Sequence, residues 1–338
     1  MMAEEDSKKD ERISYLEERL ETFPRYPLSV APTPCHLLPF LKEAFGVEVY
    51  CKREDLSGFA FGGNKTRKLE FLLGEALAQG CDTLVTCGGI QSNFCRMAAA
   101  AGAVAGMDVY LILGGRAPER LTGNLLLDSL VGAEMIFVGT PVWSVWERES
   151  ERLSERLIRE GRKVFRIPMG GSVPVGVMGY VTVFLEILEE EKRLGLSFDR
   201  IIHASGSGGT QAGLLVGQGL CAWPGKIAGI SVAMPREGLE EKVFDLARHT
   251  ASLLGGRINR DSVFVDDGFV GAGYAVPTRG AREAIQYFAT HGGLFLDHVY
   301  TGKAASALMA WLDEGRLAQE RVLFIHTGGG PELFAETG

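Results

Sequence analysis

The sequence predicts an α/β protein with two open, twisted and mostly parallel sheets, one in a large domain and one in a small domain. The first observation is that short apolar segments alternate with segments of helical periodicity from residue 48 onward. This alternation is typical of parallel sheets that are covered on both faces. The second is a pair of glycine-containing breaks, at 58–63 and 170–174. We expect the smaller unit to lie between these breaks.

The expected strands are short and mostly apolar, and longer helical segments separate them. The strands are predicted at residues 48–52, 83–86, 109–113, 134–138, 163–167, 200–204, 227–232 and 322–326. Helices are predicted at 37–45, from about 64 to 77, at 97–105 and at 214–220. We therefore assign residues 69–174 to a small α/β domain, and 23–68 with 175–338 to a large domain that binds the ligand.

The first 22 residues are polar and charged and are predicted to form an N-terminal arm. A short helix is expected at 13–20, and the arm is expected to be flexible or loosely docked. The prolines that follow indicate an extended segment, because proline and the residue before it both disfavour helix. They are Pro24, Pro27, Pro32 and Pro34.

Composition excludes several classes of function. The 338 residues allow two domains, and a net charge of −8 disfavours a nucleic-acid binder. No apolar run is long enough to span a membrane, and the first twelve residues are charged. We thus expect a cytoplasmic protein without a secretion signal or anchor. The six cysteines and six histidines lack the spacing of a metal site, so no metal is expected.

A glycine pair, Gly62-Gly63, precedes an expected helix whose first turn holds Lys65. The positive end of a helix dipole disfavours a cation there, and Arg67 and Lys68 add positive charge. Both effects are expected to lower the pKa of Lys65, and a neutral amine attacks aldehydes. The alternative is a basic surface turn that caps the helix, and this stretch alone does not separate the two.

A second loop, rich in glycine and in residues with a hydroxyl group, begins a helix after the strand at 200–204. Its members are Ser205, Gly206, Ser207, Gly208, Gly209 and Thr210. Consecutive backbone N–H groups at a helix start bind phosphate. The loop lacks the Gly-Lys-Ser/Thr of a nucleotide P-loop and does not match Gly-x-Gly-x-x-Gly, so a nucleotide-dependent dehydrogenase is disfavoured.

Two further loops carry polar side chains at strand ends. Ser92 and Asn93 begin the helix after the strand at 83–86, where an anion such as a carboxylate is attracted. Simple helix capping is the alternative. Tyr300 follows an apolar stretch near the C-terminus and is a candidate general acid or base, although packing explains most such tyrosines. An activated lysine beside a phosphate loop suggests pyridoxal 5′-phosphate bound as a Schiff base.

At this point the sequence resembles the tryptophan-synthase-β-like, fold-type-II pyridoxal-phosphate enzymes. Within them it resembles the 1-aminocyclopropane-1-carboxylate deaminase/D-cysteine desulfhydrase family, from about residue 23 to 334. The motifs that carry the resemblance are Phe23-Pro24-Arg25-Tyr26-Pro27-Leu28, Lys52-Arg53-Glu54-Asp55, Phe61-Gly62-Gly63-Asn64-Lys65-Thr66-Arg67-Lys68 and Gly89-Ile90-Gln91-Ser92-Asn93.

The resemblance implies a role for each matching residue. Lys65 binds the cofactor aldehyde and, once freed, acts as the base near Cα. Asn93 hydrogen-bonds the ring oxygen of the cofactor, and the loop from Ser205 to Thr210 holds the phosphate with help from Lys68. Ser92, Tyr274 and Tyr300 are implied to be catalytic and, with Asn93 and Thr301, to contact a small amino-acid substrate. A homodimer is also implied.

Two positions separate the subgroups of this family. The deaminases carry Glu and Leu where this sequence has Thr301 and Thr327, and the threonine pattern resembles the D-cysteine desulfhydrases. A neutral hydroxyl beside the pyridine nitrogen leaves a weaker electron sink, which favours α,β-elimination over opening a cyclopropane ring. Phe94 stands where the family commonly has a polar residue, so L-cysteate or 1-aminocyclopropane-1-carboxylate remain alternative substrates. A non-catalytic binder of phosphorylated metabolites is the alternative from another class.

Overall fold

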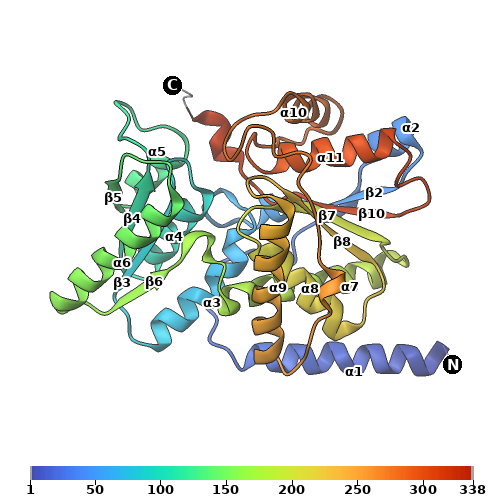
Figure 1. Ribbon diagram of the computed structural model, residues 1–338. Helices are drawn as coiled ribbons and strands as arrows, with labels where there is room; N and C mark the ends of the chain where they lie inside the picture. The colour runs from blue at the N-terminus through green and yellow to red at the C-terminus, as the bar shows by residue number, and fades with distance from the viewer. Residues whose placement is uncertain (1, 336–338) are drawn as a thin grey trace.

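The computed structural model describes residues 2–335 and consists of two sheets side by side, each sandwiched by helices (Figure 1). The first sheet has the order β1 (Cys35–Leu37), β2 (Val49–Lys52), β10 (Val322–Ile325), β7 (Arg200–Ser205), β8 (Lys226–Ser231) and β9 (Phe264–Asp266). The second has the order β5 (Glu134–Phe137), β4 (Asp108–Gly114), β3 (Thr83–Gly89) and β6 (Val164–Ile167). All neighbouring strands are parallel except β1 and β2. The predicted fold class is confirmed.

Helices cover both faces of each sheet. They are α1 (Met2–Glu21), α2 (Pro39–Phe45), α3 (Lys65–Ala78), α4 (Asn93–Val104), α5 (Gly123–Leu130), α6 (Trp143–Arg159), α7 (Pro174–Leu194), α8 (Gly209–Cys221), α9 (Arg236–Leu253), α10 (Arg279–Gly292) and α11 (Thr301–Asp313). Figure 1 places α10 and α11 above the six-stranded sheet and α7, α8 and α9 below it. Ile201 and Ile202 therefore belong to different hydrophobic clusters, although both are fully buried.

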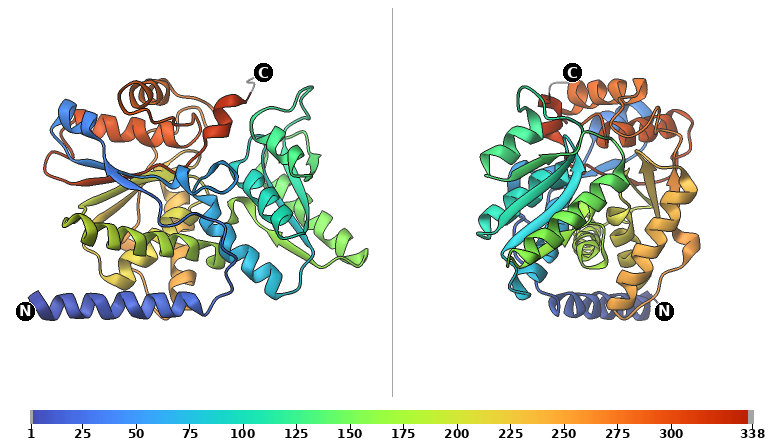
Figure 2. Two further views of the ribbon diagram at one scale, coloured as in Figure 1. Left: turned by 180° about the vertical axis from the view of Figure 1, so that it is seen from behind. Right: turned by 60° about the vertical axis from the view of Figure 1, so that its left-hand side comes forward.

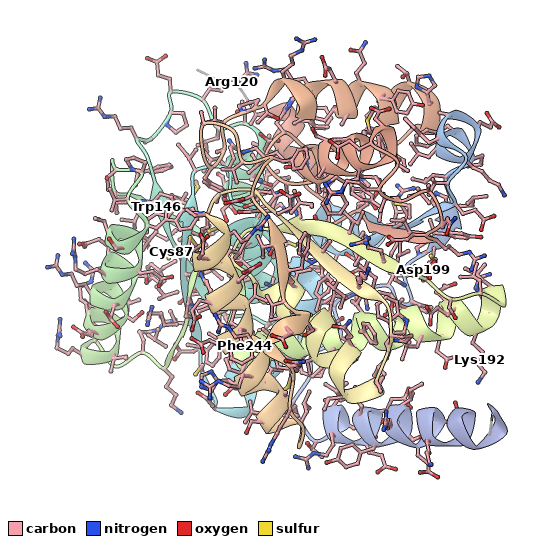
Figure 3. The ribbon with its side chains drawn as sticks, turned by 45° about the vertical axis from the view of Figure 1, so that its right-hand side comes forward. Cys87, Arg120, Trp146, Lys192, Asp199 and Phe244 are labelled. Atoms are coloured by element: carbon pink, nitrogen blue, oxygen red, sulfur yellow. The ribbon has the colours of Figure 1, made fainter. Side chains whose placement is uncertain are left out.

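The four-stranded sheet is covered in the same way. Leu84 packs toward α3 and α4 on one face, while Val85 and Cys87 pack toward α6 on the other. Figure 3 shows Cys87 and Trp146 near each other beside α6, and both belong to the α6-side cluster. Burial on both faces explains why these strands are continuous apolar runs rather than alternating ones.

All eight predicted strands are present, but the sequence reading missed β1 and β9. Each of the two has only three residues and lies at an outer edge of the six-stranded sheet. Cys35 pairs with Lys52, so β1 adds an antiparallel strand beside β2. Short edge strands carry little hydrophobic pattern, which is why propensity alone does not reveal them.

The prediction of a flexible or loosely docked arm is wrong. The chain from Met2 to Glu21 is one continuous helix, α1, which lies along the base of the molecule (Figure 2). Leu16 and Leu20 are buried against the core formed with α7 and α8, and Ile13 packs at its margin. The spacing of these three residues forms one apolar stripe on the helix, and burial of that stripe fixes α1 to the large unit. Met1 lies outside the described residues.

The four-stranded sheet is built entirely from residues between Thr83 and Ile167, while segments on both sides of it build the six-stranded sheet. The proposed boundary between Lys68 and Leu69 falls inside the continuous helix α3, which packs against α7. The domain limits themselves stay a prediction.

None of the described helices has an apolar stretch long enough to cross a bilayer. Within residues 2–335, no three His, Cys, Asp or Glu side chains gather as a metal site would require. All six cysteines are free thiols.

The docking of α1 can be tested with Leu16→Ala. Removing this fully buried side chain leaves a cavity under α1, so we expect the free energy of unfolding to fall by about 2–5 kcal/mol. Urea unfolding followed by circular dichroism measures the change. Glu18→Ala, on the exposed face of the same helix, is the control and should match the wild type. Equal stability of the two variants would contradict the docking.

Candidate active site

The turn before α3 places Lys65 at the junction of the two sheets. The backbone N–H of Asn64 donates to the carbonyl of Thr327 at 2.9 Å, and that of Gly63 donates to the carbonyl of Glu54 at 2.9 Å. A Cβ atom at Gly62 would overlap the carbonyl oxygen of Asp55, so only glycine fits there. These contacts tie the start of α3 to the segments that follow β2 and β10.

Two adjoining cavities lie around Lys65. The first, which we call the cofactor cavity after the expected ligand, is lined by Gly62, Gly63, Asn64, Lys65, Asn93, Arg96, Met97, Ala204, Ser205, Gly206, Ser207, Gly208, Thr210, Tyr300, Thr327, Gly328 and Gly329. The substrate cavity is lined by Lys65, Gly88, Gly89, Ser92, Phe94, Trp143, Met169, Gly170, Gly206, Ser207, Tyr274 and Tyr300. Lys65 is common to both.

The small-residue loop runs from the end of β7 into the first residues of α8. Within the described part of the chain, the backbone N–H groups of residues 206–210 have no hydrogen-bond acceptor. They lie at the positive end of α8, which is the arrangement that binds phosphate. Thr210 contributes a hydroxyl that accepts from the Asn64 amide at 3.0 Å. The loop therefore fits a phosphate group.

Two serines of this loop are already engaged with protein groups. The Ser205 hydroxyl donates to the Gln211 side chain at 2.9 Å and so supports the loop from within. The Ser207 hydroxyl lies 2.7 Å from that of Ser172. Ser172 and its neighbour Gly170 come from the end of the small unit, so this contact joins the two units at the loop.

Lys68 lies behind the same loop rather than in the lining of the cofactor cavity. Its amine donates to the Gly170 carbonyl at 3.2 Å and to the Ser172 hydroxyl at 3.3 Å. A Cβ atom at Gly209 would be 2.6 Å from this amine, so the cation lies directly against the loop backbone. Burial, with Lys65 and Lys242 nearby, holds the pKa of Lys68 well below its ordinary value.

The pKa of Lys65 is lowered to about 8, and the cause is burial of its amine. The sequence argument gave the direction correctly but attributed it to the helix dipole and to the charges of Arg67 and Lys68, whereas burial is the cause. The Arg67 guanidinium turns away from the cavity and pairs with Glu54 and Glu186. Its charge is balanced by these two carboxylates, and they raise the pKa of Arg67 above its ordinary value against the effect of burial.

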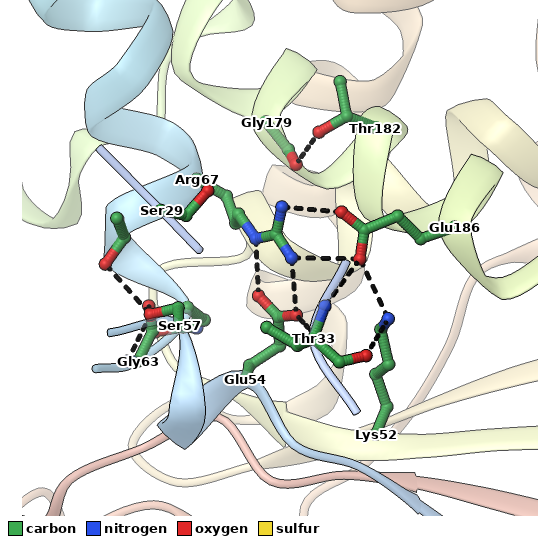
Figure 4. A network of polar contacts seen from close by, with 12 residues as sticks. Ser29, Thr33, Lys52, Glu54, Ser57, Gly63, Arg67, Gly179, Thr182 and Glu186 are labelled. Atoms are coloured by element: carbon green, nitrogen blue, oxygen red, sulfur yellow. Dashed lines mark hydrogen bonds and ion pairs between the residues drawn. The ribbon is translucent and has the colours of Figure 1, made fainter. Parts of the chain in front are cut away.

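Arg67 is the centre of a buried ionic network (Figure 4). Its guanidinium contacts Glu54 at 3.0 and 3.1 Å and Glu186 at 2.7 and 3.0 Å. Lys52 donates to Glu186 at 2.8 Å, and the Thr33 hydroxyl donates to Glu54 at 2.5 Å. Arg67 and Glu54 are fully buried. The network joins the first turn of α3 to α7, to β2 and to the segment after β2.

Ser92 and Asn93 lie at the start of α4, and each faces a different cavity. The Ser92 hydroxyl accepts from the backbone N–H of Cys95 at 3.2 Å, which is a helix cap. Ser92 also lines the substrate cavity. Capping of α4 and a role in the site are therefore compatible for Ser92. Phe94, buried behind Ser92, contributes only a ring to that cavity.

Tyr274 and Tyr300 meet at the substrate cavity with their hydroxyl oxygens 2.7 Å apart. Burial raises the pKa of Tyr274 to about 12 and that of Tyr300 well above its ordinary value. Both therefore remain protonated near neutral pH. Asp297 fixes the second tyrosine, since its carboxylate accepts the backbone N–H of Tyr300 at 2.8 Å.

The two threonines occupy different environments. Thr327 lines the cofactor cavity. Thr301 is fully buried, and its hydroxyl donates to Asp297 at 2.6 Å, so it lines neither cavity. Thr301 was expected to contact the substrate, but its side chain is turned away from both cavities. As the first residue of α11, it turns its hydroxyl back to the carboxylate that caps this helix.

Sequence reasoning missed several lining residues. Asn64 lies inside the motif that holds Lys65, and Arg96 follows Asn93 by three residues, so proximity to these two residues was the available signal. Trp143 gave no signal, because it comes from the start of α6 and reaches the site only through folding. Its ring meets Tyr274 edge to face at 5.5 Å, which joins the small unit to the large one across the substrate cavity.

A partly neutral lysine, a loop of unbonded N–H donors and the Asn93 amide in one cavity match the aldehyde, phosphate and ring oxygen of pyridoxal 5′-phosphate. The α/β fold and this site thus define an enzyme that uses this cofactor.

Comparison with known proteins gives the same result. The model of the family described as "Pyridoxal-phosphate dependent enzyme" matches residues 26–328. The "Putative 1-aminocyclopropane-1-carboxylate deaminase" of Pyrococcus abyssi is 42% identical over 316 residues, covering 93% of this chain and 94% of that protein. The 1-aminocyclopropane-1-carboxylate deaminase of Burkholderia cenocepacia is 40% identical over 336 residues, covering 94% and 98%.

A solved structure described as an ACC deaminase homologue superposes with a TM-score of 0.89 at 37% identity, covering 94% of this chain and 96% of that one. Threonine deaminase isoform 2 from Solanum lycopersicum shares the fold at a TM-score of 0.69 and 18% identity, covering 94% and 84%. The chain belongs to the pyridoxal-phosphate-dependent enzyme family, and within it to the 1-aminocyclopropane-1-carboxylate deaminase group.

The lowered pKa of Lys65 can be measured by competitive acetylation of the cofactor-free protein, read by mass spectrometry. Burial disfavours the ammonium form, so the reactive amine should appear as the pH rises through about 8. Lys42 is the control, because its exposed amine bonds Glu48 and its pKa is raised above 10.5. If Lys65 titrated at the same pH as Lys42, the lowered pKa of Lys65 would be contradicted.

The buried network can be tested with Arg67→Met. Removing the cation leaves Glu54 and Glu186 without their main partner, so we expect the free energy of unfolding to fall by about 3–5 kcal/mol. Chemical denaturation measures the change. Arg279→Met breaks an exposed pair with Glu283 and should leave stability unchanged. Two variants of equal stability would show that the network contributes nothing.

Proposed function

We propose that this enzyme catalyses α,β-elimination on a small, uncharged amino acid, with D-cysteine as the first candidate. D-cysteine and water would give pyruvate, hydrogen sulfide and ammonia. Bound pyridoxal 5′-phosphate supplies the electron sink that makes the Cα–H bond acidic. The Cα–H and Cβ–S bonds break, and the resulting enamine is hydrolysed to pyruvate and ammonia.

The residues around the two cavities have the chemistry that this reaction needs. Lys65 is common to both cavities and its pKa of about 8 suits an amine that takes and returns a proton near neutral pH. Ser92 and the start of α4 would bind the substrate carboxylate. Tyr274 and Tyr300 are both protonated, and since one hydroxyl donates to the other, the second would donate to a leaving group.

The single observation that favours elimination is the absence of a carboxylate. Among the described residues that line the two cavities, none is aspartate or glutamate. Thr327 is among the lining residues and would offer the pyridine nitrogen a neutral hydroxyl instead. A neutral partner leaves the pyridine ring a weaker electron sink, which suffices when the Cβ substituent is a good leaving group. Since Thr301 lies outside the lining, this argument rests on Thr327.

The alternatives differ in their support. Relatives named 1-aminocyclopropane-1-carboxylate deaminase favour that substrate as the second candidate. Against L-cysteate, Lys65 is the one cation among the described residues that line the substrate cavity, and it is already committed to the cofactor. A sulfonate would therefore be buried without a partner. On the family resemblance, we further propose a cytoplasmic homodimer.

Substrate assays separate these functions. The holoenzyme is incubated with D-cysteine, L-cysteine, L-cysteate and 1-aminocyclopropane-1-carboxylate while pyruvate, sulfide and 2-oxobutyrate are followed. We expect pyruvate and sulfide in equal amounts from D-cysteine, and Lys65→Ala should lower kcat by about 10²–10⁴-fold through loss of the acid–base amine. Lys42→Ala, at an exposed lysine, is the control. Formation of 2-oxobutyrate alone would overturn the elimination in favour of the deaminase.

A further inference from the structure

A set of buried polar side chains packs against Asn93 at the edge of the cofactor cavity, which Arg96 also lines, and has no role in the reaction as described so far. Arg96 comes from the first turn of α4, and Asn124 comes from the first turn of α5. Arg96 is 2% exposed and Asn124 is fully buried. Buried polar groups of this kind are costly unless they satisfy one another, so their arrangement is fixed by their hydrogen bonds.

The Asn93 amide has its oxygen occupied on the protein side. Its Oδ1 atom accepts from Nη1 of Arg96 at 3.2 Å and from Nδ2 of Asn124 at 3.0 Å. A carbonyl oxygen has two lone pairs, and both are now used. The NH₂ group of Asn93 is thereby turned to the other side, toward the cofactor cavity that this residue lines.

Arg96 determines this orientation because a guanidinium only donates. Its Nη1 group also donates to Oδ1 of Asn124 at 3.0 Å, which fixes the second amide. Asn124 then has Nδ2 left for Asn93 and for the Gln91 carbonyl, at 2.8 Å. If either amide turned over, its NH₂ group would face a donor of Arg96. The Arg96 guanidinium therefore fixes the orientation of both the Asn93 amide and the Asn124 amide.

Arg96 also reaches the lysine side of the cavity. Its Nη2 group donates to the Gly62 carbonyl at 3.1 Å, three residues before Lys65. The same side chain thus fixes the amide on α4 and the turn that presents Lys65. Its planar fork makes these contacts in separate directions, which the single ammonium of a lysine does not reproduce.

We propose that Arg96 and Asn124 are positioning residues that hold the Asn93 amide with its NH₂ group toward the cofactor, where it donates to the oxygen on the pyridine ring. This inference rests on the binding of pyridoxal 5′-phosphate in the cofactor cavity, on which the proposed function also depends. A donor stabilises that oxygen in its ionised form, whereas the amide oxygen of a turned-over Asn93 would repel it. The protonation of the ring oxygen, and with it the colour of the bound cofactor, thus depends on Arg96 and Asn124.

Asn124→Asp tests this with almost no change of volume. Aspartate has only acceptors at neutral pH, so it keeps its bond from Arg96 but draws the NH₂ group of Asn93 away from the cofactor. We expect the dissociation constant of pyridoxal 5′-phosphate to rise about tenfold, the equivalent of one hydrogen bond. We also expect the visible absorption band of the holoenzyme to lose intensity to the shorter-wavelength band of the protonated ring oxygen.

Arg96→Lys is the second variant, and Asn259→Asp is the matched control. Asn259 undergoes the same substitution at an exposed loop position away from the cavities. Arg96→Lys keeps the charge but loses the fork, so it should shift the band in the same direction as Asn124→Asp. Asn259→Asp should leave band and affinity as in the wild type. Thermal unfolding of each cofactor-free variant measures any structural cost separately.

The outcomes are distinguishable. If both variants bind the cofactor with wild-type affinity and an unchanged band, the positioning role is wrong, whatever their stability. A variant that loses thermal stability but keeps the wild-type band assigns Arg96 and Asn124 a purely structural role and also overturns the proposal. A wild-type protein that takes up no pyridoxal 5′-phosphate would instead refute the proposed function itself.

Discussion

The position of the first turn of α3 depends on one buried guanidinium. Arg67 is held between Glu54 and Glu186, with its own side chain and that of Glu54 fully buried, so the turn has little freedom to rotate or shift. Successive helix residues are about 100° apart, and this separates the three cations of the turn. Lys65 faces the cavities, Lys68 lies against the phosphate loop, and Arg67 points the opposite way into the network. One anchored residue thereby orients two others.

The site lies where three strand ends from two sheets come together. β3 leads into α4 with Ser92 and Asn93, β7 leads into α8 with the donor loop, and β10 ends just before Thr327. Ligands gather at such carboxyl ends because helix starts there present unbonded N–H groups. The two units contact each other beside the cavities, through Ser172 with Ser207 and through Trp143 with Tyr274. Both units therefore contribute to the walls of the site.

Much of the fold and the main site residues follow from the sequence, because parallel strands and glycine-rich helix starts have strong local signals. Lys65, Asn93 and Thr210 were predicted from such signals, and the structure brings them to one cavity. What the sequence did not reveal depends on long-range partners. The direction of Arg67 is set by Glu186, more than a hundred residues away, and the hydroxyl of Thr301 by a capping carboxylate. The docking of α1 likewise depends on a surface that only the folded core provides.

The position of β10 has a consequence for the order in which the protein can form during synthesis. This strand leaves the ribosome after all the other described strands, yet it pairs with both β2 and β7 in the interior of the six-stranded sheet. The four-stranded sheet is complete once Ile167 has emerged, whereas the larger sheet has a gap until Ile325 follows. Thr327, whose carbonyl holds the turn before Lys65, arrives later still. A nascent chain therefore carries a finished small sheet long before it can hold a cofactor, and its unpaired strand edges are exposed during that interval.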